Sequence, residues 1–352
     1  MLLLYADCCA LDHPGTIDVK SVNWFAIVLA AALVSATAVG VRAQERSFPA
    51  WLAEVKAEAI SAGIKADVVA AALDGLEPLP VVVERDRSQA ETTLTLDRYL
   101  ARRLDRGTVR TAREMLRRHT KLLSRVSAAY GVPSRVVVAV WGLESNFGRF
   151  VGVRPTIAAL ATLAFDERRA TYFRGELLEA LRILERGDIA VSDMKGSWAG
   201  AMGQVQFMPS SYLKHAVDFD RDGRRDIWRS QADVFASIAN YLVAHGWSRG
   251  VAWGREVKVR GAAAKIVASE PYRTAGCEAM QQLSEQRPLS EWRRIGVTDV
   301  RGKALPKTGP PASLLRSSSR YFLVYPNYES ILAYNCAQSY ALSVALLSDR
   351  LR

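Results

Sequence analysis

The chain has 352 residues, of which 49% are hydrophobic and 24% are charged, and its formal net charge at pH 7 is +11. This composition excludes an intrinsically disordered chain, and the length allows two or three packed units around a sizeable core. The excess of Lys and Arg predicts attraction to polyanions, but the basic residues are spread along the chain without a nucleic-acid-binding motif, so no nucleic-acid partner is expected.

Residues 1–43 are predicted to be an export leader. The segment 24–40 is nearly uncharged and rich in Ala, Val and Leu, and the small residues around Ala43 are typical of a signal-peptide cleavage site. The alternative is an uncleaved N-terminal membrane anchor, for which about 17 apolar residues is short. Either interpretation exports the rest of the chain, and we expect it in the periplasm. Cys8 and Cys9 precede the apolar run, so no lipid-bearing cysteine is predicted.

Residues 44–132 are predicted to form an N-terminal helical region. Apolar residues recur over 51–73 with a period near 3.6, which is typical of a helix with one buried face. A break with two prolines follows at 77–80, and two more helices are expected over 90–104 and 108–130. Gly131-Val132-Pro133 then ends the region, and Pro133 opens the next helix.

That next helix begins the predicted core of residues 133–250 and carries the most informative residue of the chain. It is apolar from Val136 to Leu143 and then ends in Glu144. Burial of this carboxyl would favour its protonated form, which could donate a proton to a leaving group. The alternative is a helix-end glutamate that points into solvent. The segment alone leaves both interpretations open.

Four further helices are expected in the core, over 157–163, 172–186, 209–216 and 232–245. The segment 196–212, between the second and third of them, is dense in Gly and small residues and contains Gln204 and Gln206. Small residues let a polymer approach the backbone, and amide side chains can bind sugar hydroxyls. A tight turn that packs helices together is the alternative interpretation of the same segment.

An acidic loop in the core begins like an EF-hand. The residues at positions 1, 3, 5 and 6 of this loop are Asp218, Asp220, Asp222 and Gly223. Position 12 is Arg229 instead of the usual Glu, which excludes a standard loop, but a longer loop that closes on Asp233 would supply a last ligand for Ca²⁺. The alternative is a solvated acidic turn paired with its neighbouring arginines.

The C-terminal third of the sequence has a different pattern. Residues 251–315 are predicted to form a small β-containing region, because 256–260 alternates polar and apolar residues and Gly and Pro cluster at 303–311. Residues 316–352 are expected to complete the core with a strand over 320–325 and a helix over 330–351. Cys277 and Cys336 are either bridged, as an oxidising compartment would favour, or two buried thiols.

Other hydrolytic chemistries find no support in the sequence. The histidines outside the leader, His119, His215 and His245, do not have the HExxH spacing of zinc proteases, and no GxSxG nucleophile motif occurs. A carboxylate-driven cleavage of glycosidic bonds remains the favoured reaction class.

Several ordered motifs resemble the lytic murein transglycosylase B family, glycoside hydrolase family 103. They begin with Glu144-Ser145-Asn146-Phe147-Gly148 and continue with 156–163, 172–177, 196–212, the acidic loop, 239–242, 245–247 and Tyr334-Asn335. The resemblance covers residues 47–350. It implies a mainly α (α+β) fold with a lysozyme-like core, an N-terminal helical region and a small β-containing insertion.

The resemblance also implies an activity. Enzymes of this family cleave the β-1,4 bond between N-acetylmuramic acid and N-acetylglucosamine in peptidoglycan without water and leave 1,6-anhydromuramic acid ends. Glu144 would be the only catalytic carboxylate, acting first as acid and then as base, and no cofactor would be required. The residues expected to hold substrate are Ser145, Ser197, Met202, Gln206, Tyr241, Tyr334 and Asn335. The expected ligands of a structural Ca²⁺ are Asp218, Asp220, Asp222, the carbonyl of Arg224, and Asp233.

Three alternatives stay open beside this lytic activity. A hydrolytic muramidase would differ only in using water as the nucleophile, a peptidoglycan-binding protein would lack catalysis, and a calcium-responsive module would use only the acidic loop. The expected partners are peptidoglycan glycan strands and, secondarily, proteins of cell-wall synthesis. The chain is expected to act as a monomer.

Overall fold

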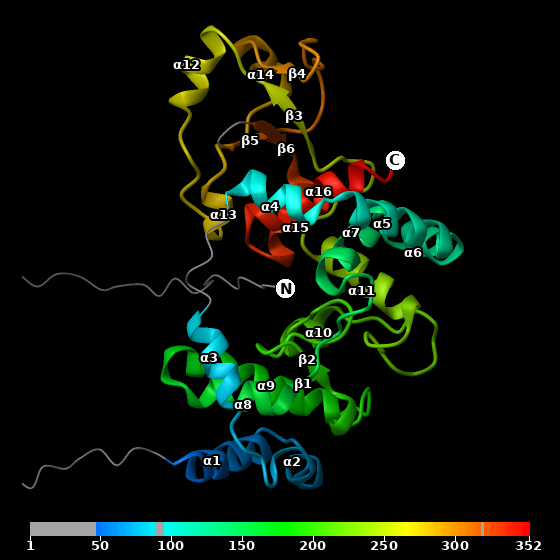
Figure 1. Ribbon diagram of the computed structural model, residues 1–352, viewed down its shortest axis with the longest axis vertical. Helices are drawn as coiled ribbons and strands as arrows, with labels where there is room; N and C mark the ends of the chain where they lie inside the picture. The colour runs from blue at the N-terminus through cyan, green and yellow to red at the C-terminus, as the bar shows by residue number, and fades with distance from the viewer. Residues whose placement is uncertain (1–46, 89–94, 318–319) are drawn as a thin grey trace, which may run out of the picture.

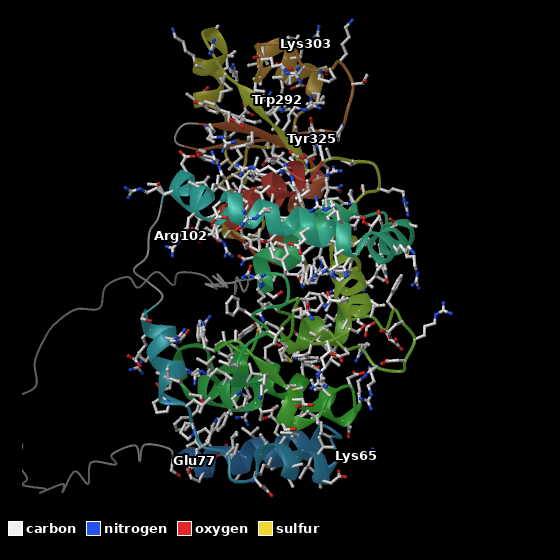
Figure 2. All side chains as sticks on the ribbon, turned by 45° about the vertical axis from the view of Figure 1, so that its right-hand side comes forward. Lys65, Glu77, Arg102, Trp292, Lys303 and Tyr325 are labelled. Atoms are coloured by element: carbon white, nitrogen blue, oxygen red, sulfur yellow. A yellow bond between two sulfur atoms is a disulfide. The ribbon has the colours of Figure 1, made fainter. Side chains whose placement is uncertain are left out.

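The computed structural model describes residues 47–88, 95–317 and 320–352. The predicted export leader and the first residues of the helix predicted over 90–104 lie outside these ranges. Figure 1 shows an elongated molecule with α1 and α2 at one end, a small sheet at the other, and α7 between them. Side chains extend along the whole length, from Lys65 and Glu77 near one end to Trp292 and Lys303 near the other (Figure 2).

Two short helices at the N-terminal end replace the single helix predicted over 51–73. They are α1 (Phe48–Ser61), which Ser47 caps by accepting a hydrogen bond from the Ala50 amide, and α2 (Ala66–Leu73). Gly63 separates them with a φ of +87°, a left-handed conformation that ends a helix at little cost in glycine. The periodicity continues across the break because both helices bury their apolar faces.

The next four helices lead to the centre of the molecule. They are α3 (Pro80–Ser88), α4 (Leu96–Arg103), α5 (Arg106–Arg118) and α6 (Thr120–Tyr130). The sequence predicts a break at 77–80 but not α3, whose charged residues hide its apolar face. The helix predicted over 108–130 is divided at His119, whose ring packs between Trp141 and Phe235 at 5.7 and 5.4 Å. The local sequence pattern does not reveal this tertiary contact, so it predicts one continuous helix.

Helix α7 (Ser134–Ser145) is the central element of the core. Every residue from Val136 to Ser145 is buried, because α5, α6, α11 (Gln231–Ala244) and α16 (Gln338–Asp349) all pack against it. The long apolar run of the sequence thus reflects a helix surrounded on all sides.

The remaining core elements follow α7. The chain forms β1 (Arg154–Pro155), α8 (Thr156–Phe165), a 3₁₀ turn η2 (Glu167–Arg169), α9 (Ala170–Glu185), a 3₁₀ turn η3 (Val191–Asp193), β2 (Lys195–Gly196) and α10 (Pro209–His215). Helices α8 and α9 pack closely against each other, and β1 pairs with β2 in antiparallel register, which joins the start of α8 to the Gly-rich segment.

A four-stranded antiparallel sheet forms the end of the molecule opposite α1. Its order is β4 (Thr298–Asp299), β3 (Gly254–Lys258), β6 (Tyr321–Val324) and β5 (Ser313–Arg316). Helices α12 (Ala262–Ala268), α13 (Glu278–Gln281) and α14 (Leu289–Ile295) accompany it, and a second apolar core forms around the fully buried Trp292. The strand predicted to complete the main core is β6, which pairs with both β3 and β5 in this sheet and contributes Phe322 and Val324 to the main core.

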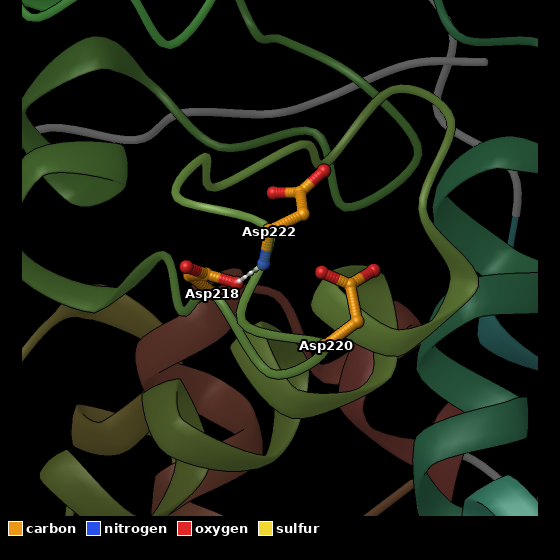
Figure 3. A group of neighbouring side chains, drawn as sticks. All are labelled: Asp218, Asp220 and Asp222. Carbon is orange, nitrogen blue, oxygen red and sulfur yellow. Dashed lines mark hydrogen bonds between the residues drawn. The ribbon is translucent and has the colours of Figure 1, made fainter.

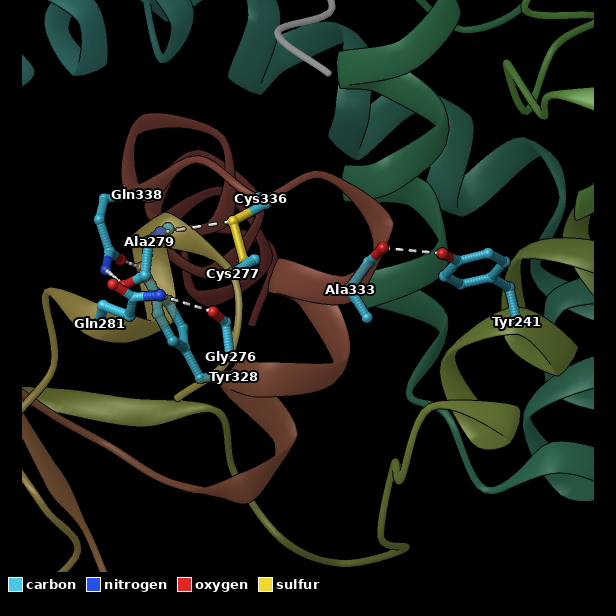
Figure 4. The surroundings of a disulfide bond; sticks show 9 residues. All are labelled: Tyr241, Gly276, Cys277, Ala279, Gln281, Tyr328, Ala333, Cys336 and Gln338. Carbon is cyan, nitrogen blue, oxygen red and sulfur yellow. Dashed lines mark hydrogen bonds between the residues drawn. A yellow bond between two sulfur atoms is a disulfide. The ribbon is translucent and has the colours of Figure 1, made fainter. Parts of the chain in front are cut away.

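Two helices at the C-terminus replace the single helix predicted over 330–351. Helix α15 (Pro326–Tyr334) ends at Asn335, and α16 begins at Gln338. A disulfide between Cys277 and Cys336 holds the connection between them against α13, with the two Cα atoms 6.3 Å apart (Figure 4). Because α16 packs against α7 and α4, this connection fixes the C-terminus to the helical core.

Within the described ranges, no single helix has both the length and the apolar character to cross a membrane. Two sharply bent helix pairs, α6 with α7 and α15 with α16, pass the test together by length and composition.

Candidate active site

Glu144 is buried at the C-terminal end of α7, with only 2% of its surface exposed. Its Oε1 atom receives no hydrogen bond from any described residue. Burial raises the pKa of Glu144 from the ordinary 4.5 to about 7, while the Tyr340 hydroxyl and the Arg103 charge act in the opposite direction. No hydrogen bond of ordinary geometry joins Tyr340 to the carboxyl. The glutamate is therefore poised to give or take a proton near neutral pH.

Two other buried glutamates of the described chain show what a structural carboxylate looks like. Glu176 accepts hydrogen bonds from the amide and the hydroxyl of Ser210, at 2.9 and 2.6 Å. Glu270 forms a two-point pair with Arg287, at 2.6 and 3.1 Å. Glu144 has no comparable pairing, which distinguishes a reactive group from a satisfied one.

The chain leaves α7 through three successive residues in left-handed conformation: Asn146 (φ 49°), Phe147 (φ 60°) and Gly148 (φ 78°). The first two are unusual outside glycine and represent stored backbone strain directly beside Glu144. Phe147 folds back onto the helix, where a Cβ atom on Gly142 would lie 2.5 Å from its ring. A glycine at position 142 is thus required for the turn that ends the helix directly after Glu144 and Ser145.

Ser145 supports this turn and does not face the site. It is fully buried, its hydroxyl donates to the Trp141 carbonyl at 3.1 Å, and the same oxygen accepts from the Gly148 amide at 3.1 Å. These hydrogen bonds hold the backbone of the turn, and the predicted contact of Ser145 with substrate stays a prediction.

The Gly-rich segment is held against α7 by Gln204. Its Oε1 accepts a hydrogen bond from Trp141 Nε1 at 2.8 Å, and its Nε2 donates to the Trp228 carbonyl at 2.8 Å. Gln206, two residues later, has a positive φ of 53° and donates from Nε2 to the Gly203 carbonyl at 2.8 Å. The Oε1 atom of Gln206 is buried without a described partner, so this amide can accept a hydrogen bond from a ligand.

Two other residues expected to bind substrate are occupied within the segment. Met202 is fully buried and exchanges backbone hydrogen bonds with Phe207, so its side chain belongs to the core. Ser197 Oγ accepts from the amides of Ala199 and Ala201 at 3.2 and 3.1 Å, which closes a tight turn. For these two residues the helix-packing interpretation of the segment describes the contacts better.

Aromatic residues from distant parts of the chain gather beside Glu144. Tyr241 on α11 donates its hydroxyl hydrogen to the Ala333 carbonyl at 2.7 Å (Figure 4), and Tyr334 donates to the Val205 carbonyl at 2.7 Å. The two rings lie 4.7 Å apart. Burial and the nearby charge of Glu144 raise the pKa of Tyr241 to about 12, so its hydroxyl stays protonated. These contacts link α11, α15 and the segment before Gln206 around the glutamate.

Asn335 and Tyr340 complete this group. Asn335 follows Tyr334 directly, and its buried Oδ1 has no hydrogen-bond partner among the described residues. Tyr340 on α16 stacks with Tyr334 at 6.3 Å, and its hydroxyl is likewise buried without a described partner. Glu144 Oε1 and Gln206 Oε1 are likewise buried without a described partner, so each of these four atoms is available to a ligand.

Tyr340 and Arg103 are site residues that the sequence does not predict. Tyr340 lies within an apolar helix that looks like core, and Arg103 is one of many arginines. Arg103 Nη2 donates to the Leu143 carbonyl at 3.0 Å, which fixes α4 to the last turn of α7. No local pattern identifies either residue, because both reach Glu144 only through helix packing.

The acidic loop offers three carboxylates to a cation. One oxygen each from Asp218, Asp220 and Asp222 lies within 4.8 Å of the others (Figure 3). Asp218 accepts hydrogen bonds from the amides of Asp222 and Gly223, which folds the loop around this position. Hard oxygen ligands at this spacing suit Ca²⁺.

Asp233 takes a different place in the loop. It is fully buried, and its two oxygens accept hydrogen bonds from the Phe219 and Asp226 amides, both at 2.8 Å. It therefore ties the two ends of the loop together and lies outside the group of three carboxylates, of which Asp218 is half-buried and the other two are exposed. The Arg224 amide donates to Asp222 Oδ1 at 2.9 Å, which brings its peptide beside the same group.

Comparisons with known proteins show which proteins this chain is similar to. Residues 47–349 match the family model described as the transglycosylase SLT domain. The chain is 35% identical over 230 residues to membrane-bound lytic murein transglycosylase B of Escherichia coli K12, a match that covers 63% of this chain and 58% of that protein. The chain thus matches less than two thirds of the length of this curated relative.

Solved structures extend the likeness to the fold. SltB3 from Pseudomonas aeruginosa, in complex with NAG-anhNAM-pentapeptide, superposes with a TM-score of 0.79 at 43% identity, over 87% of this chain and 80% of that chain. The Escherichia coli lytic transglycosylase Slt35 in complex with calcium has a TM-score of 0.71 at 28% identity, over 85% and 92% of the two chains.

Proposed function

The chain belongs to the transglycosylase SLT domain family and, within it, to the lytic murein transglycosylase B family, and from this premise we propose that it cleaves peptidoglycan as a lytic transglycosylase. The family model and the solved structures confirm the predicted family and the mainly α, lysozyme-like fold. The substrate would be the β-1,4 bond between N-acetylmuramic acid and N-acetylglucosamine. The observation that carries the proposal is the buried Glu144, whose pKa is raised to about 7 among polar atoms that lack partners.

In this mechanism Glu144 acts twice. Its protonated carboxyl first gives its proton to the glycosidic oxygen as the bond from that oxygen to C1 of the muramic acid breaks. The resulting carboxylate then takes the proton of the muramic C6 hydroxyl, whose oxygen forms a new bond to C1 and closes the 1,6-anhydro ring. A pKa near 7 suits both steps, because neither protonation state is strongly favoured over the other at neutral pH.

An intramolecular nucleophile explains why one carboxylate suffices. Ordinary glycosidases need a second carboxylate to activate water or to attack the sugar. The neighbours of Glu144 are instead neutral hydroxyl and amide groups, with the Arg103 charge at the helix end. We assign to Gln206 Oε1, Asn335 Oδ1 and the Tyr340 hydroxyl the binding of sugar hydroxyl and acetamido groups near the reacting bond.

The proposal extends to a structural Ca²⁺ and a location. Asp218, Asp220 and Asp222 would hold the ion with the carbonyl of Arg224, and Asp233 would brace the loop from behind. The ion would stabilise the loop before α11, which carries Tyr241, and would take no part in bond cleavage. Since the relatives act on murein or bind its fragments, we place the protein in the periplasm, with glycan strands as its binding partner.

Digestion of purified peptidoglycan tests the proposal. Mass spectrometry of the soluble products should find 1,6-anhydro ends, which are lighter by one water than the reducing ends that a hydrolytic muramidase would leave. Glu144→Gln should give no product while it keeps its fold. As a matched control, Glu176→Gln makes the same change at a buried glutamate with a structural partner and should keep activity wherever it is folded. Reducing ends alone, or full activity of Glu144→Gln, would contradict the mechanism.

A further inference from the structure

A basic cavity lies on the side of α5, formed with the C-terminal end of α16. It has a volume of about 480 Å³, and five of its seven lining residues are arginines: Arg106, Arg110, Arg113, Arg117 and Arg350. None of the seven belongs to the group of residues around Glu144. So many like charges on one face repel one another and lower stability, so their clustering here is not explained by folding.

The four arginines on α5 form a single row. Their spacing of four, three and four residues places them on one face of the helix, over a length of about 16 Å. Arg350 closes one side of the row: its Nη1 donates to the Leu104 carbonyl at 2.6 Å, and its own carbonyl accepts hydrogen bonds from Arg113. Two of the five arginines are thus fixed by the fold and shape the cavity wall.

The other three, Arg106, Arg110 and Arg117, are exposed and have no carboxylate partner within 4.0 Å in the described chain. Two acidic residues lie nearby. Asp105 accepts from the Thr108 amide at 2.6 Å, and this bond and the more weakly acting charge of Arg110 lower its pKa; Glu114 lies 3.9 Å from Arg118. Three guanidinium groups therefore face the cavity with their hydrogen-bond donors available, as a site for anions requires.

The floor of the cavity is apolar. It is made by Leu104 and Val109, which are 5% and 9% exposed. A row of cations above an apolar floor suits an extended segment with both carboxylates and methyl groups, such as a short peptide. A flat membrane surface fits such a recessed row less well, because lipid headgroups would meet only its outer rim.

We infer that this cavity is a second peptidoglycan-binding site, which holds the carboxylates of stem peptides at a distance from the bond that Glu144 cleaves. The inference rests on the proposed function for its choice of polymer. The arginines would form paired hydrogen bonds with peptide carboxylates, and Leu104 and Val109 would contact alanine methyl groups. Since Arg103 joins α4 to the end of α7 immediately before the cavity, a strand held here would remain close to the catalytic helix.

Binding to insoluble peptidoglycan tests the inference. The full chain with Glu144→Gln would be sedimented with sacculi at increasing concentrations, alone and with the added pair Arg110→Gln and Arg117→Gln. The matched control is Arg294→Gln with Arg301→Gln, two exposed arginines in the β-containing region that remove the same charge. The same three proteins would be tested on glycan strands from which an amidase has removed the peptides, and on vesicles of phosphatidylglycerol.

We expect the Arg110/Arg117 pair to weaken binding to intact sacculi about tenfold, the control pair to change it less than twofold, and all three proteins to bind peptide-free glycan equally. An equal loss for both pairs would show a general charge effect and overturn the inference. So would an equal loss on peptide-free glycan, or a loss on vesicles without one on sacculi. Wild type is incubated with sacculi in parallel and its soluble products are analysed, so a failure of the proposed activity is seen separately from a failure of this site.

Discussion

Replacement of Glu144 by Gln should stabilise the protein, and it should do so more at high pH than at low pH. The pKa of this carboxyl is about 7 in the folded protein against an ordinary 4.5, because burial disfavours the charged form. The folded state therefore binds more protons than the unfolded state between these two values, and stability falls as the pH rises through this window. The full difference corresponds to about 3 kcal/mol above pH 7.

The magnitude is smaller in acid. At pH 5 most of the free-energy cost of ionising the buried carboxyl is absent, and Glu144 lowers the free energy of unfolding by only about 1 kcal/mol. The stabilisation by Glu144→Gln should therefore grow by about 2 kcal/mol between pH 5 and pH 8. Thermal or urea unfolding of both proteins at these two pH values measures this change. A glutamine has its own pH-independent cost at this position, which cancels when the two pH values are compared. Parallel stability curves for wild type and variant would refute the argument that burial controls this group.

Three further predictions concern Gln206, the acidic loop and the disulfide. Gln206→Ala should lower kcat/KM on peptidoglycan about tenfold, because it removes the unpartnered Oε1 acceptor, and full activity would exclude this residue from binding. Added Ca²⁺ should raise the melting temperature of wild type, and the Asp222→Asn variant should need a higher Ca²⁺ concentration for the same rise. A wild-type melting temperature that does not change with Ca²⁺ would mean that no ion binds. Joint Cys277→Ser and Cys336→Ser substitution removes a disulfide across 59 residues and should lower the free energy of unfolding by up to about 4 kcal/mol. Urea unfolding measures this loss, and a variant that unfolds at the same urea concentration as wild type would contradict it.

The sequence predicts the elements of the core well where burial and periodicity agree. The helix that carries Glu144 begins at the position expected from Pro133, and the apolar run of the helix corresponds to packing on all sides. The breaks at Gly63 and His119 are less visible, since apolar residues continue on both sides of each. Strand β6 serves both units, because Phe322 and Val324 belong to the main core while the strand pairs with β3, a long-range contact that the local alternation does not contain.

The residues predicted for the site also fall into two groups in the structure. Tyr241 lies near Glu144 and packs against Tyr334, which precedes Asn335 and bonds to Val205 beside Gln206, although Glu144 and Asn335 are separated by 191 positions in the chain. Residues predicted from the same motifs, such as Met202, are instead part of the packing that holds the site. Motif position alone cannot separate these two roles, because a segment that approaches a ligand must also be packed from behind.

The sequence by itself determined the family, the mainly α fold, the identity of the candidate acid and the three carboxylates of the acidic loop. These features depend on residue types at fixed spacings, which the chain carries locally. Only the tertiary structure decided that Glu144 is buried with its Oε1 atom unpartnered, that Tyr340 and Arg103 influence its pKa, and that four arginines of α5 and Arg350, directly after α16, line a common cavity. Proton affinity and charge clustering are properties of the space around a group, and that space is created when distant helices pack.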